Sequence, residues 1–216
     1  MANYRILIRG GGDLGSGVAY RLLQCGWDIV IAEISQPFVL RRSVSFANAI
    51  YEESCVVEGV IARHCRTNEE ITNAILKRTI AVMIDADLTY IDTESFDIVI
   101  DARMLKKNLE KTPTNKNMLI GLGPGFAAGK NCHAVIETNR GHFLGRVIWS
   151  GTAQTDTAIP GKVAQYSYER VLRSPANGII QSHSQLGELF KKGQVIALVG
   201  NKELIAPFDG CLRGLM

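Results

Sequence analysis

The sequence predicts an α/β protein built on a mostly parallel sheet and followed by a small β-domain. Short apolar runs alternate with helical spacing over residues 4–122, which is typical of strands covered by helices on both faces. A glycine-rich turn joins the first run to the first helical segment. From about Arg173 the pattern changes to glycine-bounded turns. We therefore expect two domains, residues 1–165 and 170–216.

Composition and charge narrow the classes of function. A net charge of +3 over 216 residues is too small to indicate a nucleic-acid partner, and the densest basic stretch, Arg103–Lys116, is interpreted as a solvated loop. No apolar run approaches the roughly 18 residues of a membrane span, and no signal peptide is visible. Five scattered cysteines are typical of a reduced chain. We expect a cytoplasmic protein with no membrane partner; a homo-oligomer stays open.

The first elements predict a βαβ unit. Strands are expected over Tyr4–Ile8 and Trp27–Ile34, with a helix between them that ends at Gly26. Such a unit has parallel strands and a right-handed crossover.

Further elements follow after Pro37. A helix is expected from Arg41 to Ala49, a small inserted hairpin near 55–65, and a helix capped by Asn68 with Ile71, Ile75 and Leu76 facing inward. The remaining strands are predicted over Ile80–Ile84, Asp97–Ile100, Met118–Leu122, His133–Glu137 and Gly145–Trp149.

The glycine-rich turn, RGGGDLGSG, matches the pattern G-x-G-x-x-G. In a Rossmann-like dinucleotide site the first glycine makes the turn, the second lets the backbone approach a pyrophosphate, and the third allows close packing. An acidic residue ends the next strand, where it can accept a hydrogen bond from a ribose hydroxyl. The alternative is a tight turn without a ligand. The candidate cofactor-binding residues here are Gly10, Gly11, Gly12, Asp13, Gly15 and Glu33.

Two arginines leave the type of nucleotide open. Glu33 favours NAD or FAD, because it would repel the 2′-phosphate of NADP. However, Arg41 and Arg42 lie in the loop that would meet such a phosphate. They either bind an anion or lie on a helix surface.

A second glycine cluster, GLGPGFAAGK, fails the P-loop pattern. Pro124 stands where that pattern has glycine, and Asn131 replaces its Ser or Thr. Because this loop leaves a strand at the carboxyl edge, we expect it to form the other wall of the ligand crevice. Its candidate residues are Gly121, Gly123 and Gly125.

Polar residues elsewhere allow several interpretations. Asp85, Asp87 and Asp101 fall at strand ends, where they could hold Mg²⁺ but more commonly cap loops, so no metal site is predicted. Cys132 is interpreted as a buried structural thiol rather than a reactive one. The catalytic candidates are His133, Glu137 and His142, which could transfer a proton, bind a metal or be structural.

The C-terminal region contains the same turn pattern twice, 32 residues apart, as SPANGI and APFDGC. This pattern resembles the barrel-sandwich of biotinyl and lipoyl domains. Those carriers present a modified lysine in an exposed hairpin, whereas only Asn201–Ile205 separate Gly200 from Ala206. We therefore expect neither biotin nor lipoate at Lys202.

Four blocks together resemble the YqeB-type family, accessory proteins of the selenium-dependent molybdenum hydroxylase system: IRGGGDLGSGVAYRLLQCGW, AEISQPFVLRRSVSFANAIYE, GLGPGFAAGKNCHAVIETNRGHFLGRVI and LRSPANGII. The resemblance implies a role in maturing, or supplying labile selenium to, a molybdopterin enzyme. It implies hydroxylase subunits or other maturation proteins as partners, and an NAD-like or molybdopterin dinucleotide as ligand. The family continues beyond Met216, so the β-domain is expected to be incomplete. The motif residues shared with the family are Gly10, Gly12, Gly15, Glu33, Gln36, Pro37, Arg41, Arg42, Gly121, Gly123, Gly125, His133, Glu137 and His142.

Two other classes of function stay open. One is a self-standing NAD-dependent oxidoreductase with His133 or Glu137 as the proton-transfer group. The other is a non-catalytic scaffold whose glycine-rich turn holds no ligand.

Overall fold

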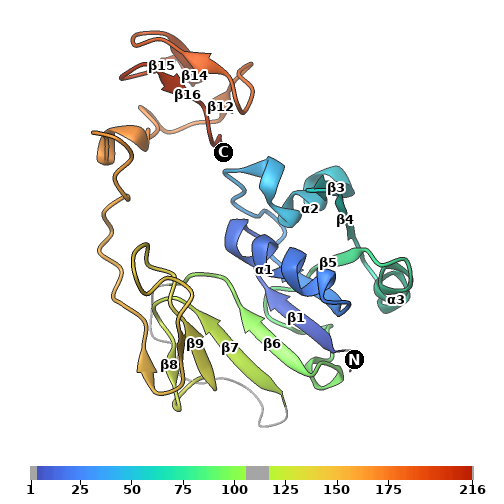
Figure 1. Cartoon of the computed structure of the whole chain (residues 1–216). Coiled ribbons are helices and arrows are strands. Elements are labelled where there is room, and N and C mark those ends of the chain that lie inside the picture. The colour runs from blue at the N-terminus through green and yellow to red at the C-terminus, as the bar shows by residue number, and fades with distance from the viewer. Residues whose placement is uncertain (1–3, 106–116, 216) are drawn as a thin grey trace. The chain divides into compact units, whose positions relative to one another are not determined.

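The computed structural model describes residues 4–105 and 117–215 (Figure 1). The chain divides into two compact units, Met1–Asp156 and Thr157–Met216, and each is described by itself. The predicted solvated loop Arg103–Lys116 lies, from residue 106 on, outside the described residues.

A nine-stranded sheet forms the first unit. Six of its strands are parallel to one another and run in the order β5-β2-β1-β6-β7-β9, the strand order 3-2-1-4-5-6 that is also found in doubly wound sheets. The order reverses between β1 and β6, and their carboxyl ends therefore flank the switch point. The bounds are β1 Arg5–Arg9, β2 Asp28–Glu33, β5 Ile80–Ile84, β6 Ile98–Asp101, β7 Met118–Leu122 and β9 Ala134–Ile136.

Each edge of this sheet is extended by an antiparallel pairing. The inserted hairpin predicted near 55–65 is confirmed as β3 (Ser54–Val57) and β4 (Val60–His64), and β4 lies parallel to β5. At the other edge β10 (Val147–Ile148) pairs with β9.

Helices cover both faces of the sheet in its first half (Figure 1). Helices α1 (Asp13–Gln24) and α2 (Ala49–Glu52) pack against one face, which includes Ile6 and Ile8 of β1. Helix α3 (Asn68–Leu76) packs against the other face, which includes Leu7. Successive side chains of a strand point to opposite faces, so a continuous apolar run supplies both cores.

The helix expected from Arg41 to Ala49 is wrong. Two 3₁₀ turns, Arg42–Val44 and Phe46–Asn48, stand there, and the α-helix begins only at Ala49. The backbone is extended at Ser45, with φ −126° and ψ 118°. Hydrogen bonds to helix α1 hold this conformation: the Ser45 hydroxyl donates to Asp13 at 2.8 Å, and the Phe46 N–H donates to the Ser16 hydroxyl at 2.7 Å. Tertiary partners thus override local helical spacing.

Two details of helix α3 also need correction. Thr67, not Asn68, caps the helix, because its hydroxyl accepts a hydrogen bond from the Glu70 N–H at 3.1 Å. Leu76 does not face inward but is 75% exposed, whereas Ile71 is buried.

The rest of the structure consists of short antiparallel pairs. In the first unit β8 (Ala127–Ala128) pairs with β11 (Gly151–Thr152), and a 3₁₀ turn covers Thr93–Ser95. The second unit packs Phe190, Ile196 and Ala206 into a small core, and its resemblance to a barrel-sandwich stays a prediction. Its elements are the 3₁₀ turn Tyr168–Arg170, the sheet β12 (Ile180–Gln181)-β14 (Val195–Val199)-β15 (Lys202–Ile205), and the pair β13 (Leu189–Phe190)-β16 (Gly210–Cys211).

Candidate functional site at the glycine-rich turn

Two of the three motif glycines serve the packing of the turn itself. A Cβ atom at Gly15 would come closer than 3.0 Å to the Gly10 carbonyl oxygen, so helix α1 can approach the turn only with glycine there. Gly10 has φ +93°, and a Cβ on it would meet the backbone of Arg103 at 3.3 Å. These are the roles that the dinucleotide fingerprint assigns to its third and first glycines.

Gly12 has no such packing role. It is the N-cap of helix α1 with φ −68°, a conformation open to any residue, and a Cβ there would meet no heavy atom within 4 Å. No hydrogen bond within the described part of the chain uses the N–H groups of Gly12, Asp13 or Leu14. A helix N-terminus with unpaired N–H groups beside open space suits a phosphate.

Glu33 lies beside the turn, where the sequence predicts it. Its Oε2 atom accepts a hydrogen bond from the Gly11 N–H at 2.7 Å, and its Oε1 atom accepts one from the Ile34 N–H at 2.8 Å. The carboxylate therefore holds the turn against the end of β2. Each oxygen keeps a further lone pair that can accept a hydrogen bond from a ligand hydroxyl.

Gly11 is enclosed by the protein. Its carbonyl oxygen accepts hydrogen bonds from the Ala47 N–H at 2.9 Å and the Ser16 hydroxyl at 2.8 Å. A Cβ on Gly11 would lie 3.0 Å from the Ala47 nitrogen. The segment after β2 thus closes one side of the turn, whereas Gly12 borders open space.

Asp13 and Arg41 form an ion pair at the N-terminus of helix α1, and Ser45 donates to the same carboxylate. The negative Asp13 side chain stabilises the helix end in the way a bound anion would. An anionic ligand at Gly12 would therefore compete with Asp13 for the guanidinium. Arg42 is exposed and begins a 3₁₀ turn.

Two arginines at the switch point were missed by the sequence analysis. Arg103 binds the buried Asp101 carboxylate through Nε at 3.0 Å and Nη2 at 2.6 Å, while Nη1 of Arg9 lies 3.8 Å from the same carboxylate. Burial lowers the pKa of Arg9, and the nearby Arg103 lowers it further. Two guanidiniums thus face one carboxylate between β1 and β6. The sequence did carry a signal for both arginines. Arg9 stands directly before the first glycine, and Arg103 follows the strand-end residue Asp101 by two positions.

Two of the three strand-end aspartates, Asp85 and Asp101, are engaged by the protein. Asp85 is 5% exposed and accepts hydrogen bonds from the N–H groups of Thr89, Tyr90 and Ile91 at 2.7, 3.0 and 2.7 Å. It is a loop cap, and Asp101 is an ion-pair partner. Among the residues that the structure describes, no group of three or more His, Cys, Asp or Glu side chains is placed to hold a metal ion.

The second glycine cluster also serves packing. A Cβ on Gly121 would overlap the buried ring of Phe126, and one on Gly123 would overlap the Thr138 hydroxyl and approach Met104. These contacts join the ends of β6, β7 and β9. Gly125 has φ +100°. The loop therefore lies at the same carboxyl edge as the glycine-rich turn, as the sequence analysis expected.

The catalytic candidates do not form one cluster. The exposed His133 lies before β9, and its Nδ1 atom accepts a hydrogen bond from the Leu119 N–H at 2.9 Å, at the amino edge of the sheet. Glu137 lies after β9 and is 3% exposed. Its carboxylate accepts hydrogen bonds from the N–H groups of Asn139 and Gln154 at 2.7 and 2.8 Å. His142 is exposed and packs edge-on against Phe143.

The remaining residues singled out by sequence have unremarkable surroundings. Cys132 is 8% exposed, and burial raises the pKa of its thiol. Lys202 begins β15 and is exposed.

None of the helices that the structure describes is long and apolar enough to cross a membrane.

The fold and the site define a mixed α/β protein with a glycine-rich strand–helix turn at the carboxyl edge of a mostly parallel sheet. The chain is 44% identical over 211 residues to the protein YqeB of Escherichia coli (strain K12). The match covers 98% of this chain and 39% of that relative, so the chain spans well under half of the relative's length. No protein-family model and no solved structure matches the chain. The similarity supports the YqeB-type resemblance.

Proposed function

We propose that the chain is an accessory protein for the maturation of a selenium-dependent molybdenum hydroxylase, and that it binds a dinucleotide or related phosphate ligand at the glycine-rich turn. The similarity to YqeB supports the family part of this proposal, and the family resemblance supplies the maturation role. The ligand would be an NAD-like or molybdopterin dinucleotide. The partners would be hydroxylase subunits or other maturation proteins.

Gly12 is the observation that carries the ligand proposal. In a turn where neighbouring glycines are needed for packing, this glycine packs against nothing within 4 Å. A glycine beside open space and unpaired helix N–H groups suits a ligand that must approach the backbone. The strand order and the position of Glu33 support the same interpretation.

The arginines near the turn suggest how the negative charge of the ligand would be neutralised. They are Arg9, Arg103 and Arg41, which is paired with Asp13. A pyrophosphate at Gly12 would lie between the helix N-terminus and the arginine-rich switch point. Arg41 would exchange its partner Asp13 for a phosphate oxygen. The chain's own groups would thus bind and orient the ligand without moving a strand or helix.

A thermal-shift screen tests this proposal. Purified protein is heated with NAD⁺, NADH, NADP⁺, FAD, ATP or a cytidine-containing dinucleotide. A ligand at about 100 times its dissociation constant should stabilise the protein by roughly 2.7 kcal/mol, which raises Tm by several degrees.

Gly12→Val and Gly17→Val form a matched pair for this screen. A Cβ at either glycine meets nothing within 4 Å; Gly12 is the N-cap of helix α1, and Gly17 lies within its second turn. Both variants should therefore fold. Gly12→Val should lose the ligand-induced shift and Gly17→Val should keep it. If Gly12→Val responds to the ligand as the parent does, the ligand does not lie at this turn.

A structural turn without a ligand is the second candidate. The protein's own groups hold the turn, which favours this alternative. Gly11 is hydrogen-bonded by Ala47, Ser16 and Glu33. Asp13 is bound by Arg41 and Ser45. No shift with any nucleotide, together with binding to a hydroxylase subunit, would support this scaffold. A self-standing oxidoreductase would instead show substrate-dependent turnover of nicotinamide.

A further inference from the structure

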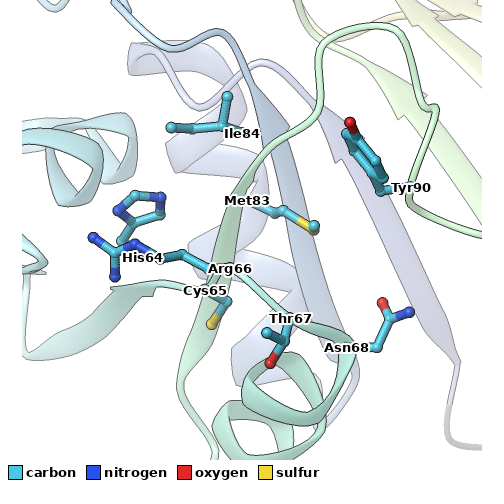
Figure 2. Close-up of a pocket in the computed structure, with 8 residues that line it drawn as sticks. All are labelled: His64, Cys65, Arg66, Thr67, Asn68, Met83, Ile84 and Tyr90. Carbon is cyan, nitrogen blue, oxygen red and sulfur yellow. The ribbon is translucent and has the colours of Figure 1, made fainter.

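The pocket of about 410 Å³ at the carboxyl ends of β4 and β5 is not a separate site (Figure 2). Its lining residue Met83 belongs to the core on the face of helix α3, whereas the next residue, Ile84, points to the opposite face of the sheet. Ile84 is also the register partner of Glu33, so the pocket continues the edge that carries the glycine-rich turn. A surface with no part in that turn lies at the end of the strand order, beside β9 (Figure 1).

The hairpin that joins β9 to β10 is exposed along almost its whole length. Every residue from 139 to 147 is exposed, and Trp149, just after β10, is 65% exposed. Apolar side chains that gather in one exposed place, with polar residues around them, mark interaction sites. The exposed apolar and arginine side chains of this segment, here called the hairpin surface, are Arg140, Phe143, Leu144, Arg146, Val147 and Trp149.

Hydrogen bonds of Glu137 fix the shape of the hairpin. Its N–H donates to the Arg146 carbonyl at 2.9 Å, and its own carbonyl accepts from the Gly145 N–H at 2.8 Å. Its buried carboxylate accepts two more backbone hydrogen bonds. The Arg146 guanidinium lies 5.4 Å from the centre of the Phe143 ring, and the His142 ring packs edge-on against that ring. Because these groups are held in place before a partner arrives, little conformational entropy is lost on binding.

The charge of this segment favours an acidic partner. Residues 138–152 contain Arg140, His142 and Arg146 but neither aspartate nor glutamate. Two such surfaces would repel each other, which disfavours a second copy of this chain as the partner. Two arginines and a net charge of +3 are also few for a nucleic-acid backbone. Because a guanidinium binds a carboxylate in bidentate geometry, acidic side chains match this surface best.

Strand β10 offers the backbone of a sheet edge. It is the last strand in the order of its sheet, so no strand of the described residues pairs with its outer side. An extended segment can add to such an edge through backbone hydrogen bonds. Because β10 contains only Val147 and Ile148, it can supply few of these bonds, and contacts with the aromatic side chains must supply most of the affinity.

We propose that the hairpin surface binds an extended acidic segment of a partner protein. The segment lies beside β10 and packs its apolar side chains on Trp149 and Phe143. Its carboxylates pair with Arg140 and Arg146. Three strands, β9, β7 and β6, separate β10 from β1, so this surface is independent of the ligand proposed for the glycine-rich turn.

Selection of peptides on the whole chain tests this proposal. A display library of random short peptides is bound to the immobilised protein, and an enriched peptide is then synthesised with a fluorescent label. Enriched sequences should combine Asp or Glu with apolar residues. In fluorescence anisotropy, Trp149→Ala should weaken binding of the labelled peptide about thirtyfold, the loss expected for an aromatic anchor.

Charge variants test whether acidic groups are recognised. Arg146→Glu should weaken binding about tenfold. A peptide with its acidic residues replaced by lysine should bind the double variant Arg140→Glu/Arg146→Glu better than it binds the parent. The matched controls are Tyr90→Ala and Arg63→Glu, which remove an exposed ring and reverse an exposed charge elsewhere in the first unit, and both should leave affinity unchanged.

The proposal is overturned if no peptide is enriched, if the enriched peptides lack acidic residues, or if they bind Trp149→Ala as tightly as the parent. A dimer in sedimentation that Trp149→Ala dissociates would overturn it in favour of a second copy. Binding to vesicles of phosphatidylserine and phosphatidylcholine that Trp149→Ala loses, without peptide binding, would overturn it in favour of a lipid surface. Gly12→Val should bind the peptide as the parent does, so a failure of nucleotide binding leaves this proposal standing.

Discussion

Replacing Asp85 with asparagine should destabilise the first unit by several kcal/mol although the side chain keeps its shape. Asp85 is 5% exposed and accepts three backbone hydrogen bonds from the loop that carries Tyr90. One carboxylate oxygen accepts from Thr89, and the other accepts from both Tyr90 and Ile91. An asparagine side chain has the same shape but only one acceptor oxygen.

The magnitude follows from these three bonds. If the amide oxygen takes the position that serves two N–H groups, the amide NH₂ faces the Thr89 N–H, and one donor is left buried without a partner. A hydrogen bond to a charged acceptor contributes about 1.5–3 kcal/mol, and the two retained bonds are weakened because the acceptor is neutral. We expect a loss of about 2–4 kcal/mol in the free energy of unfolding.

Urea unfolding followed by tryptophan fluorescence measures this loss. Both tryptophans, Trp27 and Trp149, belong to the first unit, so the signal reports on that unit alone. With a slope of about 2 kcal/mol per M, the midpoint should fall by roughly 1–2 M. Asp92→Asn is the control, because Asp92 is an exposed cap for Glu94 and asparagine caps as well as aspartate. A change below about 0.5 kcal/mol for Asp85→Asn would refute the assignment of Asp85 as the loop's cap.

Two further predictions address packing and thiol chemistry. Gly15→Ala should lower the free energy of unfolding by roughly 1–3 kcal/mol in the same urea assay, since its Cβ would overlap the Gly10 carbonyl; an unchanged midpoint would contradict this close approach. Burial raises the pKa of Cys55, Cys65 and Cys132, so Ellman's reagent should modify the exposed Cys25 and Cys211 first. The raised thiol pKa values stabilise the fold fully below the unfolded pKa of about 8.5, and this stabilisation should be lost as the pH rises through the folded values. Equal labelling rates for all five cysteines would contradict the predicted order of modification. A urea midpoint that rises with pH above 9 would contradict the predicted loss of stability.

The predicted elements were most accurate where hydrophobic periodicity decides structure. Ile80–Ile84 and Met118–Leu122 are strands with the expected bounds, because a parallel strand covered on both faces must be apolar throughout. Prediction failed at Arg41–Ala49, where the hydrogen bonds of Ser45 and Phe46 to distant residues oppose the helix. Such partners leave no periodic trace in the sequence.

For the candidate site, sequence sufficed to place the glycines and Glu33 together, because a strand–turn–helix–strand unit brings the carboxyl ends of neighbouring strands to one edge. It could not indicate which glycine packs against protein and which borders open space. That distinction depends on where Ala47, Arg103 and the Gly10 carbonyl lie. His133 and Glu137 likewise share a strand in sequence yet bind backbone groups at opposite edges of the sheet.

The sequence by itself determined the α/β class, the parallel strands and the position of the glycine-rich turn, since local periodicity and turn chemistry depend on neighbouring residues. Only the tertiary structure decided the strand order, the ion pair of Arg9 with Asp101, and the hydrogen bonds of Ser45 and Phe46 to helix α1. These features join residues far apart along the chain. They arise from packing, which depends on three-dimensional distance and not on separation in the sequence.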